Sequence, residues 1–129
     1  MHDRSGMKVY ALIDPRDPLA AEYVRYVGCS ANPKLRLRRH IWETRHPNVL
    51  MNIPKFFFIL YCLLDGVLPR MLVLEEVFPG RDPLVREQYW IQFFREHGGN
   101  LTNFQRPAPA PVPEGEPHFT RALNGARWW

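Results

Sequence analysis

The stretch EYVRYVGCSANPKLRLRRHIW, residues 22–42, contains the change from strand to helix on which the fold depends. Residues 23–27 are rich in strand-forming types, and Gly28 follows at a point where two backbones can approach closely. Residues 7–13 have the same character, and a polar loop with two prolines, residues 14–22, separates the two runs. We therefore predict two strands that form a hairpin with a long loop.

A helix is expected to follow this hairpin. Asn32 is a residue type that caps helices, and Pro33 suits the first helical position. The apolar residues that recur at helical spacing after this start are Leu35, Leu37, Ile41 and Trp42. The pattern predicts that the helix ends near His46-Pro47.

The rest of the folded part is predicted to add two helices and one strand. Residues 55–64 are apolar on all sides, and their length favours a buried helix over a strand. Residues 71–77 have the composition of a strand. A further helix opens at Asp82-Pro83 and is closed by Gly98-Gly99. The expected order is strand, strand, helix, helix, strand, helix.

Length and composition bound the number of domains. A chain of 129 residues has room for one ordinary domain, and 46% hydrophobic residues are enough to form its core. We place this domain at residues 1–105. Residues 106–129 form a proline-rich tail, which cannot pair as a regular strand and is expected to be flexible. Its terminal pair, Trp128-Trp129, is a candidate contact for a protein partner.

Positive charge is concentrated in one part of the chain. The formal net charge of +4 favours an anionic partner. No acidic residue occurs between Glu22 and Glu43. The basic residues in that window are Arg25, Lys34, Arg36, Arg38 and Arg39. Such a cluster is typical of a nucleic-acid-binding surface, and it is also seen on solvated helix faces.

Cysteine usage and hydropathy indicate the cellular compartment. Cys29 and Cys62 stand far apart and form no C-x-x-C pair, so neither a zinc site nor a disulfide framework is indicated. The longest apolar run, residues 56–64, is far shorter than the roughly 20 residues that span a bilayer. We therefore expect a soluble cytoplasmic protein with no membrane partner and no signal peptide.

The last predicted helix contains a carboxylate among apolar residues. Residues at spacings of three, four and three share one helix face, and they are Leu84, Glu87, Ile91 and Phe94. Because burying an unpaired charge is costly, Glu87 needs a metal ion, a cation or a hydrogen-bond donor as a partner. Pairing with an arginine at the edge of the stripe is an alternative that the sequence leaves open.

Two other groups suit phosphodiester chemistry. Arg36 and His40 are four residues apart and project from the same side of the predicted helix. Arginine can bind a phosphate bidentately, and histidine can exchange protons near neutral pH. Tyr10 and Tyr26 lie on the two neighbouring strands. A solvated arginine-rich face and packing tyrosines are the structural alternatives for these residues.

Together these residues resemble the GIY-YIG nuclease family, over roughly residues 7–104. The matching segments, in chain order, are Lys8-Val9-Tyr10, Tyr26-Val27-Gly28, Arg36, His40, residues 86–91 (REQYWI) and residues 100–103 (NLTN). Lys8 stands where the family usually has glycine, and Val9 stands where it has isoleucine. We expect the lysine at position 8 to affect how the substrate approaches the site, and not to affect the fold.

The resemblance implies an α/β domain of the α+β type, with a central three-stranded antiparallel sheet flanked by helices. It also implies an endonuclease that hydrolyses DNA phosphodiester bonds with one divalent ion, Mg²⁺ or Mn²⁺. Glu87 would bind that ion, and Arg36 would stabilise charge in the transition state. Tyr10 would deprotonate or position the attacking water, and Tyr26 would help to orient that network.

The resemblance also implies supporting roles. His40 would assist Tyr10 or contact phosphate, and Asn103 would brace the site. The residues that we expect to contact the substrate are Gly28, Lys34, Arg38 and Arg39. A tyrosine with an ordinary pKa near 10 is a poor base at neutral pH, so its hydroxyl needs a neighbouring histidine, cation or metal-bound water.

Two alternatives belong to other functional classes. A nucleic-acid-binding module on the same scaffold would use the basic cluster for affinity without cleaving. A cysteine hydrolase would use Cys29 as nucleophile and His40 as base, although nothing in the sequence places the thiol against the imidazole.

Overall fold

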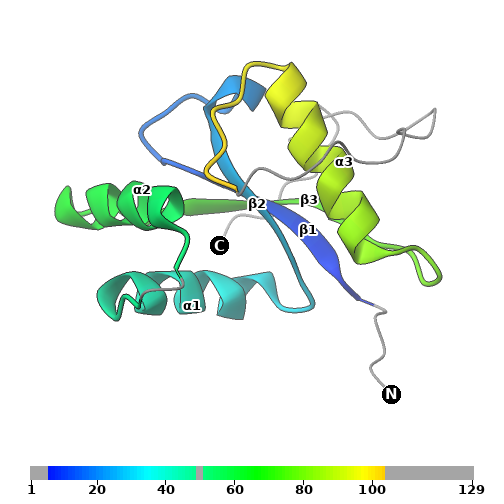
Figure 1. The fold of residues 1–129 in the computed structure, drawn as a ribbon, viewed down its shortest axis with the longest axis horizontal. Helices are drawn as coiled ribbons and strands as arrows, with labels where there is room; N and C mark the ends of the chain where they lie inside the picture. Colours follow the sequence, from blue (N-terminus) through cyan, green and yellow to red (C-terminus); the bar gives the residue numbers. More distant parts are fainter. Residues whose placement is uncertain (1–5, 49–50, 104–129) are drawn as a thin grey trace.

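The computed structural model describes residues 6–48 and 51–103. The sheet has three antiparallel strands in the order β2-β1-β3, namely β1 (Lys8–Ile13), β2 (Val24–Ser30) and β3 (Arg70–Glu76). The α-helices that pack on it are α1 (Pro33–Arg45), α2 (Ile53–Leu64) and α3 (Pro83–Glu96) (Figure 1). The predicted α/β architecture, with a three-stranded antiparallel sheet flanked by helices, is confirmed, as is the predicted order of strands and helices.

Each α-helix begins with the same local signal. The N-cap residues and the backbone N–H groups that donate to their side chains are Asn32 with Leu35, Asn52 with Lys55, and Asp82 with Leu84. A proline occupies the first or second position of every one of these helices, where its missing N–H has no intrahelical partner to lose. The helix starts predicted at residues 32–33 and 82–83 are confirmed, and α2 starts two residues before the predicted boundary.

The strands are shifted slightly from their predicted bounds. β2 begins at Val24, one residue after the predicted start, and continues to Ser30, while Ala21–Tyr23 forms a short 3-10 helix in the preceding loop. Gly28 therefore lies inside the strand, where it pairs with Tyr10 of β1. β3 begins one residue before the predicted 71–77 segment.

β1 is the central strand, and its side chains point alternately into two cores. The core on the α3 side includes Val9, Ala11, Trp90, Ile91 and Phe94. The core on the side of α1 and α2 includes Tyr10, Leu12, Leu37, Phe58 and Ile59. Figure 1 shows the same arrangement, with α3 on one face of the sheet and α1 and α2 on the other.

α1 and α2 bury less apolar surface than their sequences suggested. In α2, Phe57, Tyr61 and Leu64 are 45%, 60% and 70% exposed. In α1, Leu35 and Trp42 are also exposed. Each helix covers the sheet from one side, so it buries one stripe and leaves the opposite stripe outside. The prediction of a helix at residues 55–64 is confirmed, and the prediction that it is buried all round is wrong.

α3 buries a different stripe from the predicted one. Leu84 is 56% exposed, and Glu87 is only partly buried. The buried residues of α3 are Pro83, Arg86, Trp90, Ile91 and Phe94. The prediction of a stripe that runs through Leu84 and Glu87 is therefore wrong, and the charge that this helix does bury is the guanidinium of Arg86.

The buried guanidinium of Arg86 is neutralised by Glu75 of β3. Arg86 Nε donates to Glu75 Oε2 at 2.8 Å, and Arg86 Nη2 donates to Glu75 Oε1 at 2.7 Å. Trp90 Nε1 also donates to Glu75 Oε1, at 3.1 Å. The two hydrogen bonds of the pair, together with the third from Trp90, offset the cost of removing both charges from water. The pair ties α3 to the outer strand of the sheet.

The free edge of β2 is covered by the segment that follows α3. The backbone N–H and the hydroxyl of Thr102 both donate to the carbonyl of Arg25, at 2.6 Å each. The side-chain amide of Asn103 accepts from the N–H of Val27 at 2.9 Å and donates to its carbonyl at 2.8 Å. An edge strand otherwise presents unpaired backbone groups, so these bonds complete the sheet at this point.

None of the helices in the described ranges is long and apolar enough to cross a membrane. The proline-rich tail predicted at residues 106–129, with Trp128-Trp129, lies outside the described residues.

We predict that Arg86→Met lowers the free energy of unfolding by about 3–5 kcal/mol, because it leaves the Glu75 carboxylate buried without its partner. Urea denaturation followed by circular dichroism measures the loss. The double variant Arg86→Met/Glu75→Met should recover most of the stability, since it removes both buried charges. Arg16→Met, which breaks exposed ion pairs with Asp14 and Asp65, is the control and should have little effect. A double variant as unstable as Arg86→Met alone would contradict this account.

Candidate active site

Tyr10 lies across Gly28 of the neighbouring strand. A Cβ at position 28 would fall 2.5 Å from Tyr10 Cζ and closer still to its hydroxyl oxygen. No side chain other than hydrogen fits there while the tyrosine keeps its position. Gly28 is therefore explained by the packing of Tyr10, which lets the phenol reach from β1 over β2 toward α1.

The Tyr10 hydroxyl meets His40 of α1. The distance between Tyr10 Oη and His40 Nε2 is 2.7 Å, and both residues are almost completely buried. The Tyr26 ring stands edge-on to the imidazole, with centroids 5.3 Å apart. Three ring systems from β1, β2 and α1 thus form one cluster, in which Tyr10 and His40 are buried and Tyr26 is partly buried.

Lys55 of α2 contacts the other side of the imidazole. Its Nζ lies 3.2 Å from His40 Nδ1 and 3.9 Å from Glu43 Oε2. It also lies 5.1 Å from the centroid of the Tyr26 ring, within the range of a cation–π contact. Both nitrogens of His40 therefore have polar partners, one from the sheet and one from α2.

One face of α1 supplies the charged groups beside this cluster. Arg36 Nη1 lies 3.5 Å from Glu43 Oε1, and Arg39 Nε donates to the same oxygen at 3.0 Å. Arg36, His40 and Glu43 are spaced by four and three residues, so they lie on adjacent turns of one helix face. Glu43 is shared by two arginines of α1 and by Lys55 of α2.

Burial dominates the protonation of the cluster. It raises the pKa of the Tyr10 hydroxyl above its usual 10.0, with a further rise from Tyr26, while Arg36 lowers it. Burial, together with the positive charges of Lys55 and Arg36, lowers the pKa of His40 from 6.5 to about 2. The pKa of Lys55 is also lowered by burial, against the opposing pull of Glu43. At neutral pH Tyr10 is a phenol and His40 is a neutral imidazole.

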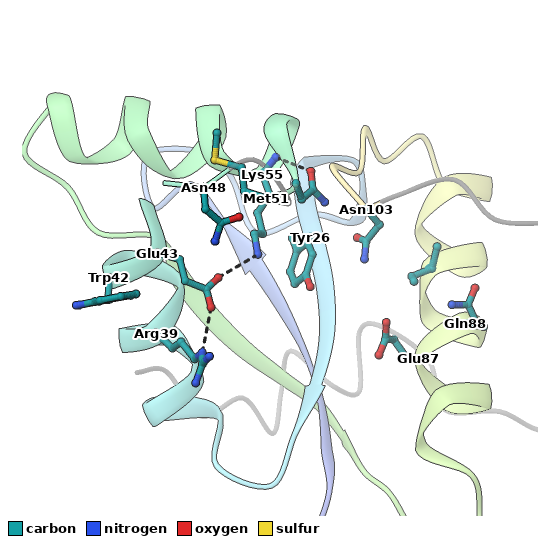
Figure 2. Close-up of a pocket in the computed structure, with 12 residues that line it drawn as sticks. Tyr26, Arg39, Trp42, Glu43, Asn48, Met51, Lys55, Glu87, Gln88 and Asn103 are labelled. Carbon is teal, nitrogen blue, oxygen red and sulfur yellow. Dashed lines mark hydrogen bonds and ion pairs between the residues drawn. The ribbon is translucent and has the colours of Figure 1, made fainter. Parts of the chain in front are cut away.

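A cleft of about 380 Å³ opens beside the cluster, along the edge of β2 (Figure 2). Its charged and polar lining residues include Tyr26, Arg39, Glu43, Asn52, Lys55, Glu87, Gln88 and Asn103. Figure 2 shows Glu87 reaching in from α3, opposite Glu43 and Lys55 on the other wall. The carboxylate of Glu87 also contributes to the raised pKa values of Tyr10 and Cys29. We call this space the β2 cleft.

Most of the residues predicted for the site surround this cleft. Tyr26, Glu87, Asn103 and Arg39 line it directly. Tyr10 and His40 are buried behind Tyr26 and Lys55.

The other predicted residues lie elsewhere. Arg36 and Arg38 line a neighbouring hollow of about 840 Å³ along α1, which we call the α1 hollow. Lys34 is exposed on α1 and lines neither space. Gly28 is buried under Tyr10, so its surroundings identify it as a packing position.

The donor set of the β2 cleft restricts the kind of metal that could bind there. Within the described ranges, no group of three or more His, Cys, Asp or Glu residues could hold a metal ion. Mg²⁺ commonly uses one or two carboxylates together with water and substrate phosphate. Glu87, with a cleft wide enough for water and phosphate, fits that pattern.

Two residues of the site, Glu43 and Lys55, are not among those predicted from the sequence. Glu43 stands three residues after His40 on the same helix face, a spacing that could have been noticed. Lys55 is the only charged residue in α2, and it lies at the helix start beside the capping Asn52. A lone lysine in an apolar helix indicates that its ammonium group contacts a specific partner. The identity of that partner does not follow from the sequence.

The cysteine hydrolase alternative is contradicted by the geometry. Both cysteines are free thiols, and Cys29 packs against the core on the α3 side. His40 lies on the opposite face of the sheet, with Tyr10. Burial, with the nearby carboxylates of Glu87 and Glu75, raises the pKa of Cys29 to about 11. A thiol with that pKa and no contact with the imidazole is not an activated nucleophile.

Comparison of the chain with protein-family models, with curated proteins and with solved structures finds no match.

We predict that neutral, buried His40 makes the protein sensitive to acid. In the unfolded chain this histidine binds a proton below pH 6.5, whereas in the fold it does so only near pH 2. The unfolding free energy should therefore fall as the pH drops below 6.5, by at most about 1.4 kcal/mol per pH unit from this residue. Urea denaturation at pH values between 6.5 and 4.5 measures the slope.

The control for this prediction removes the titrating group. His40→Gln should flatten the slope, while His97→Gln, at an exposed histidine, should leave it unchanged. Equal slopes in the parent and in His40→Gln would contradict the assignment.

Proposed function

We propose that the protein is a metal-dependent endonuclease that hydrolyses DNA phosphodiester bonds, of the kind that the resemblance to GIY-YIG nucleases implies. The observation that carries the proposal is the grouping of four residues at the β2 cleft: Tyr26 and Glu87 line it, Tyr10 and His40 are buried beside it, and Arg36 lies alongside. These residues come from four elements of the fold and are up to 77 positions apart in the chain. Residues that pack only for stability have no reason to bring a tyrosine, an arginine, a histidine and a carboxylate together.

The basic residues of α1 support an anionic substrate. Arg36, Arg38 and Arg39 line the α1 hollow, and Arg39 also lines the β2 cleft. A DNA strand that lies across α1 would therefore meet guanidinium groups up to the point where Glu87 faces the cleft. Phosphate contacts of this kind release counterions, so binding should weaken steeply as salt is added.

Each group has a distinct part in the proposed reaction. Arg36 would donate to a non-bridging phosphate oxygen and stabilise the charge that develops as water attacks phosphorus and the bond to the leaving oxygen breaks. Tyr10 would hold the attacking water through its hydroxyl, which its raised pKa leaves protonated at neutral pH, once a movement of the cleft wall exposes this buried phenol. A divalent ion bound by Glu87 would neutralise the phosphate and lower the pKa of a coordinated water.

A non-cleaving nucleic-acid-binding module is the second candidate function. It is favoured by the burial of Tyr10 and His40, which keeps both groups from direct contact with a substrate in this conformation. The basic residues of α1 would serve this function equally well. Cleavage assays separate the two candidates, because only the nuclease turns over.

We predict that Glu87→Ala abolishes cleavage while DNA binding persists, because the variant loses the metal ligand but keeps the basic residues. Supercoiled plasmid is incubated with the parent or variant in Mg²⁺, in Mn²⁺ and in chelator, and nicking is followed on gels. Glu96→Ala removes an exposed carboxylate from the end of the same helix and should cut like the parent. A Glu87→Ala protein that cuts at the parental rate would refute the metal assignment. A parent that binds in a salt-sensitive way without cutting would favour the binding module.

We further predict that Arg36→Ala lowers the cleavage rate by about two or more orders of magnitude, as the loss of a donor to a developing oxyanion does in other enzymes. Single-turnover kinetics with excess protein measure the rate without a contribution from product release. Arg45→Ala removes an exposed arginine from the last turn of the same helix and is the matched control. A similar loss in both variants would point to general electrostatic attraction instead of a transition-state role.

A further inference from the structure

Lys55 occupies an unusual position for a lysine. It is the only charged residue of α2, and its side chain is 13% exposed. Its Nζ lies between His40 Nδ1, the Glu43 carboxylate and the face of Tyr26, at 3.2, 3.9 and 5.1 Å. A long cationic side chain normally extends its charged end into water. Here that end is held against a buried imidazole, so the contact requires an explanation.

The hydrogen-bonding capacity of the groups fixes the direction of the bonds. A lysine ammonium has three donors and no acceptor, so His40 Nδ1 must accept from it. A neutral imidazole carries one N–H, which must then be on Nε2. Nε2 therefore donates to Tyr10 Oη, and the phenol proton is left free to point away from the histidine. The reverse tautomer would place an N–H against the ammonium, where it has no acceptor.

The proton on Lys55 depends on the groups around it. The charged or titratable groups that face the cluster are Tyr10 and Tyr26 from the sheet, Arg36, His40 and Glu43 from α1, and Glu87 from α3. Burial and Arg36 lower the pKa of Lys55 from its usual 10.5, while Glu43 raises it. The Glu43 carboxylate thus favours the ammonium form on which the tautomer depends.

We propose that Lys55 is a positioning residue that fixes the tautomer of His40, so that the imidazole donates its Nε2 proton to the Tyr10 hydroxyl. This inference rests on the proposed function for its catalytic meaning, since the oriented phenol is the group that would hold the attacking water. His40 then acts as a hydrogen-bond donor that polarises the Tyr10 hydroxyl, and not as the base that deprotonates Tyr10. Removal of the ammonium frees Nδ1 to carry the proton and lets Nε2 accept from Tyr10.

The first experiment reads the tautomer directly. Nitrogen-15 NMR of the full-length protein at pH 7 distinguishes protonated from unprotonated ring nitrogens, and His40→Gln assigns the signals of His40. The parent should carry its proton on Nε2. Lys55→Met, which keeps an unbranched side chain one atom shorter and removes the charge, should shift the population to Nδ1–H. Lys55→Arg should retain Nε2–H, and Lys8→Met, at the start of β1, should change nothing.

Two results would overturn the inference. One is a parent in which Nδ1 carries the proton, a measurement that does not depend on Lys55→Met and so stands even if that variant does not fold. The other is a folded Lys55→Met protein, judged by its backbone amide spectrum, in which His40 remains protonated on Nε2.

A second experiment tests the catalytic consequence. Lys55→Met should lower kcat for plasmid cleavage by about 10–100-fold, the range seen when a group that orients a functional histidine is removed, with KM nearly unchanged. Lys55→Arg should recover much of the rate. A fall in affinity alone would mean that Lys55 binds DNA and does not position His40.

The two experiments separate failure of this inference from failure of the proposed function. A parent with the expected tautomer but no cleavage would refute the proposed nuclease activity and leave the positioning role of Lys55 intact. If the parent cleaves DNA but the tautomer of His40 is unchanged in Lys55→Met, the nuclease activity stands and the positioning role of Lys55 is refuted.

Discussion

The hydrogen bond between Tyr10 and His40 is the contact around which the candidate site is built. It joins the central strand to α1 across a buried interface, at 2.7 Å. It exists only because Gly28 leaves room for the phenol to cross β2, and because Asn32 and Pro33 start α1 where its second turn brings His40 over the sheet. The cleft forms where this contact meets the edge of β2. Geometry at the site therefore follows from the packing of one aromatic ring.

The two faces of the sheet handle buried charge differently. On the α3 side, Arg86 and Glu75 satisfy each other through two hydrogen bonds, so that pair contributes to the fold. On the side of α1 and α2, three ion pairs in the described ranges form a cluster around one carboxylate. Glu43 is shared by Arg36, Arg39 and Lys55, which leaves an excess of positive charge beside the cleft. Such an excess attracts an anion, and phosphate has the matching charge.

The sequence predicted local structure well because short-range signals determine it. Asn32-Pro33 and Asp82-Pro83 placed two helix starts correctly. The rings of Tyr10, Tyr26 and His40, which we predicted for one site, lie close together in the fold. What failed depended on contacts between distant segments. The partner of Arg86 lies on another element, so the helix pattern pointed to Glu87 as the buried charge instead. Lys55 was missed for the same reason, since nothing in α2 reveals that its neighbour is His40.

The protonation states of the cluster constrain how the site could act. Burial keeps Tyr10 as a phenol and His40 neutral, so neither is a strong base in this state. Arg36 already lowers the pKa of Tyr10, and additional positive charge in the cleft would lower it further, because a nearby cation favours the phenolate. Glu87 acts in the opposite direction and raises that pKa as long as its own charge is not neutralised. A cation bound at Glu87 would remove this opposing effect and would therefore lower the pKa of Tyr10.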